Sequence, residues 1–152
     1  MKKVFIALLI GLLLTACAGT RERMVEDPGS PAKVALLKQR AEAFWTAFVK
    51  EDYEKAYTFY EPFFRARTNK NKFIGTTGLV KYHSFEIKDI KVEGNVAHLT
   101  VRVAYSIPKV KYKVSEFSQP ETQTEFVDSW LFIDENWYRE YKSDEHAGFT
   151  EY

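Results

Sequence analysis

The chain of 152 residues has one cysteine, Cys17, so no disulfide can form within it. A fold without disulfides must be stabilised by its hydrophobic core. Charge of one sign is also not in excess, because 22 Lys and Arg stand against 21 Asp and Glu, a formal charge of +1. This balance argues against a nucleic-acid partner, since such binding depends on neutralising phosphates. The sequence also has no apolar run of about 20 residues, the length that spans a bilayer.

The longest apolar run is short and lies near the start of the chain. Lys2 and Lys3 precede apolar residues at 4–14, and Leu14-Thr15-Ala16-Cys17 follows. This order is typical of an export signal. The last four residues resemble the lipobox of bacterial lipoproteins, in which signal peptidase cuts before an acylated cysteine. The alternative is an ordinary secretory signal that is cut nearby and leaves Cys17 as a spare thiol.

The lipobox resemblance implies a signal peptide at 1–16, lipid attachment at Cys17 and a tether at 17–29. Loss of Lys2 and Lys3 with the signal leaves the chain close to neutral. Each buried methylene of an acyl chain contributes about 0.8 kcal/mol, so two or three chains imply stable membrane anchoring. Ala18 stands where lipoproteins kept at the inner membrane tend to have Asp. This favours the bacterial outer membrane, facing the periplasm.

Residues 30–142 predict a single domain, followed by a tail at 143–152. The first predicted element is a helix from about 31 to 50, with Ser30 as N-cap and Pro31 at the first helical position. Its apolar stripe has helical spacing: Val34, Leu37, Ala41, Phe44, Trp45 and Phe48. Asp52 is expected to cap a second helix, which Pro62 ends or bends. One further helical turn is expected within 68–75.

After Gly78 the apolar period changes to 2, which predicts strands. A change of parity between Ile87 and Ile90 predicts a bulge near Lys88-Asp89, and Pro108 must sit at a bulge or an edge. Turns are expected at 93–95, 118–121 and 134–136, and a last strand at 137–141. Helices followed by hairpin-linked strands indicate an α+β fold, an antiparallel sheet with helices on one face.

The order of elements and three residue groups resemble the nuclear-transport-factor-two-like superfamily, which includes ketosteroid isomerase and scytalone dehydratase. The groups are Phe44-Trp45-x-x-Phe48, Asp52-x-x-x-Ala56-Tyr57 and Trp130-x-x-x-Asp134-x-x-Trp137-Tyr138. The chain has Glu135-Asn136 where the family often has Gly. The resemblance implies a strongly curved, cone-shaped sheet around the helices, with an apolar pocket at its open end. It also implies that a homodimer through the sheet face is plausible.

Aromatic residues on the predicted inward faces are candidates to line that pocket: Trp45, Tyr57, Phe85, Tyr105 and Trp130. The alternative is that these side chains fill the core, because a small domain without disulfides needs large apolar groups there. Residue types alone do not separate a filled core from a ligand site, and we weight core filling above ligand binding.

The catalytic members of the superfamily use a pocket Asp or His as general base, and Asp128 with Tyr57 is the leading candidate pair here. Asp128 shares strand parity with Phe126 and Trp130, which allows an inward carboxylate; an edge or bulge position is the alternative. His83 is a further candidate on the parity of Phe85, whereas His98 is expected on the outer face. His146 has no assigned role. No phosphate loop, metal-ligand cluster or nucleophile motif is present in the sequence, so no metal or cofactor is predicted.

Basic residues gather at two places. Lys109, Lys111 and Lys113 share one face of a predicted strand, and a second group follows the second helix, at Arg65, Arg67, Lys70 and Lys72. Such a strand face is a candidate site for anionic lipid, peptidoglycan or an acidic partner. The alternative is an edge strand that its lysines protect from aggregation.

The sequence therefore predicts a membrane-anchored envelope lipoprotein without enzymatic activity. Its cone-shaped domain is expected to bind a protein partner or a small apolar ligand. Two alternatives stay open: an isomerase- or dehydratase-like enzyme, and a purely structural component of the envelope.

Overall fold

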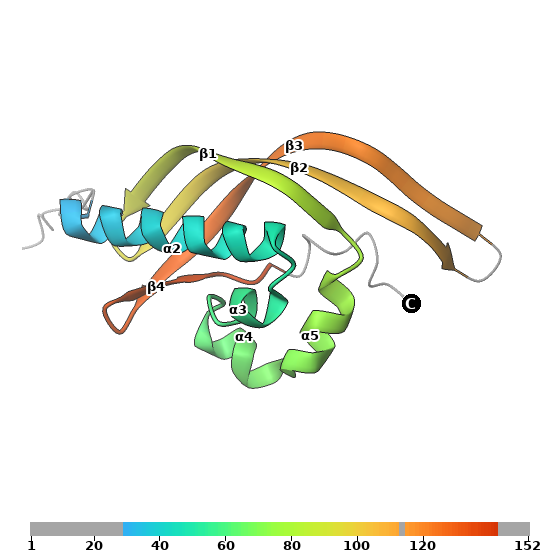
Figure 1. Cartoon of the computed structure of the whole chain (residues 1–152). Coiled ribbons are helices and arrows are strands. Elements are labelled where there is room, and N and C mark those ends of the chain that lie inside the picture. The colour runs from blue at the N-terminus through green and yellow to red at the C-terminus, as the bar shows by residue number, and fades with distance from the viewer. Residues whose placement is uncertain (1–28, 113–114, 143–152) are drawn as a thin grey trace, which may run out of the picture.

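The fold is an α+β arrangement in which a strongly curved antiparallel sheet covers a group of helices (Figure 1). The computed structural model describes residues 29–112 and 115–142. Within them the elements are α2 (Pro31–Val49), α3 (Tyr53–Tyr57), α4 (Pro62–Arg67), α5 (Lys70–Thr77), β1 (Lys81–Glu93), β2 (Val96–Tyr112), β3 (Ser115–Ile133) and β4 (Asn136–Arg139). The predicted signal peptide, Cys17, the tether up to residue 28, Lys113 and the 143–152 tail with His146 lie outside the described residues.

The longest helix, α2, begins as the sequence predicts. The Ser30 hydroxyl accepts a hydrogen bond from the Lys33 amide at 3.2 Å, and Pro31 occupies the first turn. These two residues satisfy one free amide and remove another, which fixes the start of the helix. The predicted apolar stripe is the buried face, with Leu37, Ala41, Phe44, Trp45 and Phe48 all buried.

The second helix is shorter than predicted. Asp52 caps α3 through the Lys55 amide at 3.1 Å, but the helix ends at Tyr57. The chain then runs beside β4, where the Arg139 amide donates to the Phe59 carbonyl at 2.8 Å. The backbone groups of Phe59 and Glu61 that pair with Arg139 are no longer available for the hydrogen bonds of a continued helix. Pro62 consequently begins a separate helix, α4, as its first residue.

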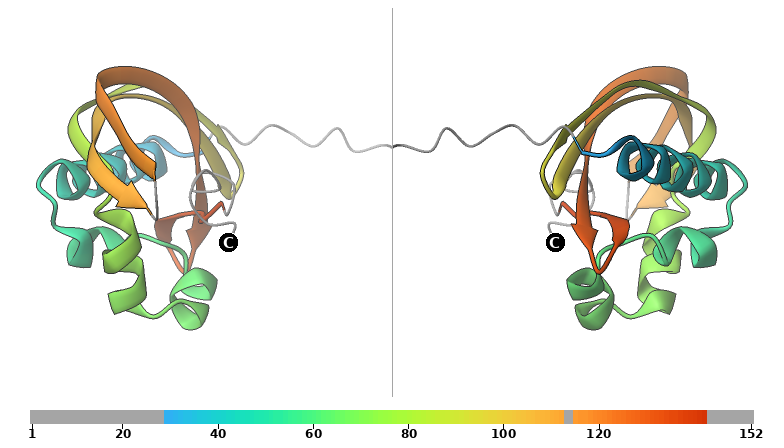
Figure 2. Two further views of the ribbon diagram at one scale, coloured as in Figure 1. Left: turned by 90° about the vertical axis from the view of Figure 1, so that its right-hand side faces the viewer. Right: turned by 90° about the vertical axis from the view of Figure 1, so that its left-hand side faces the viewer.

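The four strands form a simple antiparallel meander in the order β1-β2-β3-β4. The bulge predicted near Lys88-Asp89 is confirmed by a register shift between Ile87 and Asp89. The expected irregularity at Pro108 is also confirmed, by a shift between Ile107 and Val110. Figure 2 shows the sheet curling over the helices. We call the end of the sheet at the tip of the β2–β3 hairpin its open end.

The turn predicted at 118–121 is wrong, because β3 runs without a break from Ser115 to Ile133. Gln119 pairs with Ile107 and Thr122 pairs with Tyr105, so Pro120 lies in a bulge between them. A bulge residue leaves the hydrogen-bonding ladder, which makes it a tolerated place for a proline without an N–H. The β2–β3 hairpin therefore extends further than the sequence predicts.

The last hairpin turns at Asp134 and Glu135, whose φ values are 47° and 61°. Two positive φ values are what a tight two-residue hairpin turn requires, and Gly usually supplies at least one of them. The turn predicted at 134–136 is therefore present without Gly. The strand that follows it, β4, ends at Arg139, short of the predicted limit at 141.

Candidate functional site

A cavity of about 480 Å³ lies at the open end of the sheet. Its apolar wall is formed by Phe44, Trp45, Phe48, Leu79, Val80, Val103, Ile107, Phe117 and Phe126. Its polar lining among the described residues consists of Tyr60, Thr76, Thr77, Tyr82, Tyr105, Gln119, Thr124, Tyr141 and Arg139, and Arg139 is the charged member of this set. This size and lining are typical of small-molecule sites.

The cavity exists because strands β2 and β3 extend further than helix α2, which packs beneath them. The last two turns of α2 contribute Phe44, Trp45 and Phe48, after which the helix ends at Val49. The β2–β3 hairpin continues beyond this point and passes over the end of α5 (Figure 1). Leu79 and Phe117 are 40% and 47% exposed although both line the cavity, so the mouth is apolar as well.

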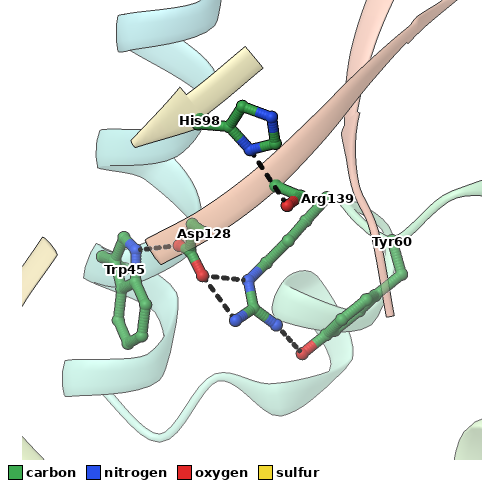
Figure 3. Close-up of polar contacts among 6 residues, drawn as sticks. Trp45, Tyr60, His98, Asp128 and Arg139 are labelled. Atoms are coloured by element: carbon green, nitrogen blue, oxygen red, sulfur yellow. Dashed lines mark hydrogen bonds and ion pairs between the residues drawn. The ribbon is translucent and has the colours of Figure 1, made fainter. Parts of the chain in front are cut away.

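At the inner end of the cavity the Arg139 guanidinium forms a buried ion pair with Asp128 (Figure 3). Arg139 Nε and Nη2 both donate to Asp128 Oδ1, at 2.9 and 2.5 Å. Arg139 is 4% exposed and Asp128 is 1% exposed. A buried charge is tolerated when it is paired and hydrogen-bonded, and this pair meets both conditions.

Two aromatic residues complete the polar group around this pair. Trp45 Nε1 donates to Asp128 Oδ2 at 2.9 Å, so both carboxylate oxygens accept hydrogen bonds. Arg139 Nη1 donates to the Tyr60 hydroxyl at 3.0 Å. We call Trp45, Tyr60, Asp128 and Arg139 the inner polar cluster (Figure 3).

The inner polar cluster is assembled by strand alternation and by one short bridge. Trp130 pairs with Arg139 across the β3–β4 ladder, and Asp128 lies on the same face of β3 as Trp130. Tyr60 forms a parallel bridge with Arg139, which brings the segment after α3 alongside β4. The guanidinium also lies over aromatic rings, 5.0 Å from the Phe44 centroid and 5.5 Å from that of Tyr60. Ring faces of this kind attract the cation.

The structure places two of the five predicted lining residues on the cavity wall, Trp45 and Tyr105. The other three lie elsewhere. Phe85 packs on Trp45 with ring centroids 6.4 Å apart, and Trp130 is fully buried against Phe44. Tyr57 packs between Phe64 and Phe73. Trp130 thus belongs to the hydrophobic core, and the half-buried Tyr57 and Phe85 pack against it.

The predicted catalytic pair of Asp128 and Tyr57 is not assembled. Asp128 points inward as predicted, but it is not among the described residues that line the cavity, and Arg139 and Trp45 occupy its oxygens. The Tyr57 hydroxyl donates to the Arg65 and Thr68 carbonyls at 3.0 and 2.7 Å. It therefore ties the segment after α4 to α3 and does not face Asp128.

Neither described histidine reaches the cavity. A register shift between Tyr82 and Ser84 turns His83 outward, against the inward position that its parity predicts. His83 Nε2 lies 2.8 Å from the Ser106 hydroxyl. His98 lies on the outer face as predicted, with Nδ1 3.3 Å from the Ser129 hydroxyl (Figure 3). Ser129 follows Asp128 on β3, so its side chain lies on the opposite face of the sheet from that of Asp128.

The predicted basic strand face is partly neutralised. Lys109 and Lys111 both form ion pairs with Glu116, and Lys111 Nζ lies 3.4 Å from Glu116 Oε1. In the second basic group, Lys70 pairs with Glu54 at 3.1 Å, and the Arg65 guanidinium lies 5.6 Å from the ring of Tyr138. These contacts reduce the free positive charge at both places, and the two interpretations of the lysines stay predictions.

Three described groups outside the inner polar cluster have shifted pKa values. Burial lowers the pKa of Arg40, whose Nε donates to the Trp137 carbonyl. Burial also raises the pKa of Tyr53, and the charge of Glu51 adds to that shift. A hydrogen bond from Lys91 lowers the pKa of Glu93 on the surface. None of these groups lines the cavity.

The described residues lack two further features, a metal-binding side-chain group and a helix that could span a membrane. No group of three or more His, Cys, Asp or Glu side chains is placed to hold a metal ion in residues 29–112 and 115–142. Within the same ranges, no helix has the length and apolar character needed to cross a membrane.

Sequence reasoning missed Arg139 and Tyr60. Arg139 has the same strand parity as the buried Trp137, and Asp128 has the parity of the buried Trp130 on the neighbouring strand. An inward Arg and an inward Asp on adjacent strands are a signal for a buried ion pair. Tyr60 gives no such signal, because its place depends on a bridge between segments far apart in sequence.

Comparisons with solved structures support the fold. A SEC-C motif-containing protein from Rhodopseudomonas palustris is 9% identical, with a TM-score of 0.51 over 72% of this chain and 85% of that one. A protein from Exiguobacterium sibiricum described as a Ca/calmodulin-dependent kinase II association domain is 11% identical, with a TM-score of 0.51 over 74% and 91%. A protein from Streptomyces avermitilis described as a dehydratase of the NTF2-like family is 12% identical, with a TM-score of 0.48 over 71% and 91%.

No protein-family model matches the sequence, and no curated protein matches it. The solved structures with TM-scores of 0.51 show that this α+β fold, with helices on a curved antiparallel sheet, also occurs in other proteins. At these identities the similarities establish the fold alone, because this kind of fold carries unrelated functions.

Proposed function

We propose that the protein is a lipid-anchored binding module whose domain holds a small, mainly apolar ligand. One observation carries this proposal: the cavity of about 480 Å³ with aromatic and aliphatic walls at the open end of the sheet. Protein interiors normally contain few voids larger than a water molecule. A concave site of this size with mostly apolar walls and an apolar mouth therefore favours a binding role.

The distribution of exposed apolar side chains favours a small ligand over a protein partner. The large exposed apolar residues in the described part of the chain are Phe63, Leu79, Val96, Phe117 and Val127. Leu79 and Phe117 belong to the cavity mouth, and Val96 and Val127 lie on the sheet. A protein interface would need a larger contiguous patch.

The inner polar cluster argues against an acid–base role for Asp128. A general base must reach the proton that it removes, within about 2.6–3.2 Å or through one water. Asp128 instead accepts hydrogen bonds from Arg139 and Trp45 and does not line the cavity. We therefore propose that the cluster is a fixed polar wall at the end of a binding site.

Titration with a neutral apolar fluorophore such as Nile red tests binding. The chain from residue 17 onward, carrying Cys17→Ala, is used, because it lacks both the apolar signal and the acylation site and needs no detergent. Thr124→Trp on β3 places a large ring in the cavity and is expected to weaken binding at least tenfold. Val127→Trp is the matched control, since Val127 is 48% exposed and does not line the cavity. Equal binding by all three proteins would place the dye elsewhere and refute the proposal.

Metabolic labelling with a fatty-acid analogue tests the anchor separately. The Leu14-Thr15-Ala16-Cys17 motif supports acylation at Cys17. The unmodified chain is expected to be labelled and to sediment with membranes, whereas Cys17→Ala is expected to be unlabelled. A chain that remains unlabelled with Cys17 present would refute the anchor without affecting the binding site.

A further inference from the structure

We propose that helices α4 and α5 dock the domain on an anionic membrane surface. In this arrangement Phe63 enters the interfacial region of the bilayer, and Arg67, Lys70 and Lys72 contact the lipid headgroups. We call these four residues the α4–α5 surface. The proposed contact is independent of the cavity and does not require acylation of Cys17. Three observations carry it: an exposed aromatic side chain, an uneven distribution of charge and the position of the two helices.

Phe63 is the most exposed large apolar side chain in the described ranges, at 77%. The helix buries the neighbouring Phe64 instead, against Phe73 of α5 with ring centroids 6.0 Å apart. Phe63 and Arg67 are four residues apart, so they lie on the same face of α4. An exposed aromatic side chain beside a cation is typical of helices that contact the membrane interface.

The segment that forms these helices is purely basic. Residues 62–78 contain four basic residues and no acidic residue, so the rest of the chain is net acidic. Arg67 and Lys72 are exposed, and neither forms an ion pair within the described ranges. Lys70 pairs with Glu54 at 3.1 Å, but both side chains are exposed and such pairs are weak. The α4–α5 surface therefore has positive charge that is available to an external anion.

The two helices are placed where a flat partner can reach them. In Figures 1 and 2, α4 and α5 lie on the side of the domain farthest from the arch of β1, β2 and β3. The Tyr57 hydroxyl donates to the Arg65 and Thr68 carbonyls, which fixes the connection between the helices. A bilayer can consequently approach the α4–α5 surface without meeting the sheet.

An anionic bilayer fits these features better than a protein partner does. A standard protein interface buries about 800 Å² on each side, around a cluster of apolar anchors. On α4 and α5, Phe63 is the large exposed apolar side chain among the described residues. A lipid surface accepts a single inserted ring and attracts each nearby Lys or Arg separately. Anionic headgroups supply the charge that complements this surface.

Co-sedimentation with vesicles tests the inference, using the chain from residue 17 onward with Cys17→Ala. Vesicles of phosphatidylglycerol and phosphatidylcholine in equal parts are expected to bind it at low salt, and phosphatidylcholine alone is not. Salt at about 0.5 M is expected to release the protein, because it screens the headgroup charge. Equal binding to both vesicles, or binding to neither, overturns the inference. Binding to double-stranded DNA as tightly as to anionic vesicles would show attraction to charge alone and also overturns it.

Two matched pairs of substitutions separate the α4–α5 surface from net charge. Arg67→Gln with Lys72→Gln is expected to weaken vesicle binding at least tenfold, at about fivefold for each charge removed. Lys109→Gln with Lys111→Gln is the control, because it removes equal charge from a face that Glu116 partly neutralises. The control is expected to lose less than half as much affinity. Equal losses in the two variants overturn the inference.

A fluorophore at Phe63 tests which side chain enters the bilayer. Cys17 is the one cysteine of the sequence, so Phe63→Cys combined with Cys17→Ala offers a single thiol for the environment-sensitive dye NBD. Its emission is expected to rise and shift to the blue on anionic vesicles, because the dye leaves water. Val127→Cys on β3 is the matched control, 48% exposed and expected to show no change. An unchanged spectrum at Phe63 in vesicle-bound protein overturns the inference. Circular dichroism verifies that each variant is folded.

Discussion

The two ends of the curved sheet are built from the same strands, yet one end is filled and the other is hollow. At the closed end, Leu99 and Val101 of β2 are fully buried under α2, together with Trp130 and Trp137. At the open end, Tyr105 of β2 and Phe126 of β3 are only half-buried and border the cavity. Strand alternation is similar at both ends, so the difference comes from what covers the sheet.

The closed end is sealed by polar contacts between α2 and two hairpins. Lys33 Nζ donates to the Gly94 carbonyl at 2.6 Å and to Asn95 Oδ1 at 2.9 Å. The Trp137 indole donates to the Lys33 carbonyl at 2.9 Å. The open end has no equivalent in the described ranges, because α2 stops at Val49 while β2 and β3 continue. The position of one helix end thus separates a packed core from a binding cavity.

Removal of a closed-end tryptophan is expected to have the largest effect on stability. Trp137→Ala should lower the free energy of unfolding by about 3–5 kcal/mol, because it leaves a large void and removes the indole hydrogen bond to the Lys33 carbonyl. Urea denaturation measures this change. Phe126→Ala at the open end is the matched comparison and should have less than half that effect, since Phe126 already borders a cavity. Equal losses would mean that the two ends are packed alike.

The inner polar cluster lies between the two ends and gives the next largest effect. Asp128→Leu should lower the free energy of unfolding by about 3 kcal/mol, because it leaves Arg139 buried without its counter-ion. Adding Arg139→Met should restore most of that loss. A double-mutant cycle from urea denaturation measures the coupling. Additive effects of the two substitutions would contradict the ion pair.

The hairpin turns allow a smaller, paired test. Glu135→Gly should raise the free energy of unfolding by about 0.5–1 kcal/mol, since Glu135 has φ 61° and Gly adopts this conformation without strain. Gly94→Ala should lower it by about 1 kcal/mol at φ 62°, where no atom lies within 4 Å of an added Cβ. Thermal unfolding measures both changes. Shifts of the same sign would show that backbone conformation does not control these turns.

Glu93 at the closed end gives the smallest expected effect, and it depends on pH. The Lys91 hydrogen bond lowers the pKa of Glu93 below its ordinary value of 4.5. The folded state therefore binds the Glu93 proton less tightly than the unfolded state does, so this contribution to stability is present above pH 4.5 and is lost as pH falls through the folded pKa.

Glu93→Gln should consequently make the acid loss of stability slightly shallower and leave stability at pH 7 almost unchanged, because the group is fully exposed. Unfolding midpoints between neutral pH and acid measure this. A steeper acid loss in the variant would contradict the assigned direction.

Local signals in the sequence predicted much of the fold correctly. Ser30 and Asp52 cap helices because capping depends on neighbouring amides, and the parity change between Ile87 and Ile90 marks a bulge because alternation is a local property. The error at 118–121 has a local cause too. Pro120 favours a turn in sequence, but a bulge opposite Tyr105 and Ile107 accommodates it within a strand.

The candidate site was less predictable because it depends on distant contacts. Trp45 and Tyr105 were placed correctly from periodicity, whereas Tyr57 and Phe85 also have inward parity but meet other side chains before the cavity. Whether an inward-facing residue packs in the core or lines the cavity depends on where α2 ends relative to β2 and β3. No single segment contains that information.

The direction of α2 has a consequence for how ligand reaches the site. The helix starts at the closed end and its last two turns border the cavity, and 19 residues at 1.5 Å each place its ends about 28 Å apart. The chain therefore enters the domain at its closed end, on the side away from the cavity. A label or tag attached next to Gly29 would consequently leave the mouth of the cavity unobstructed.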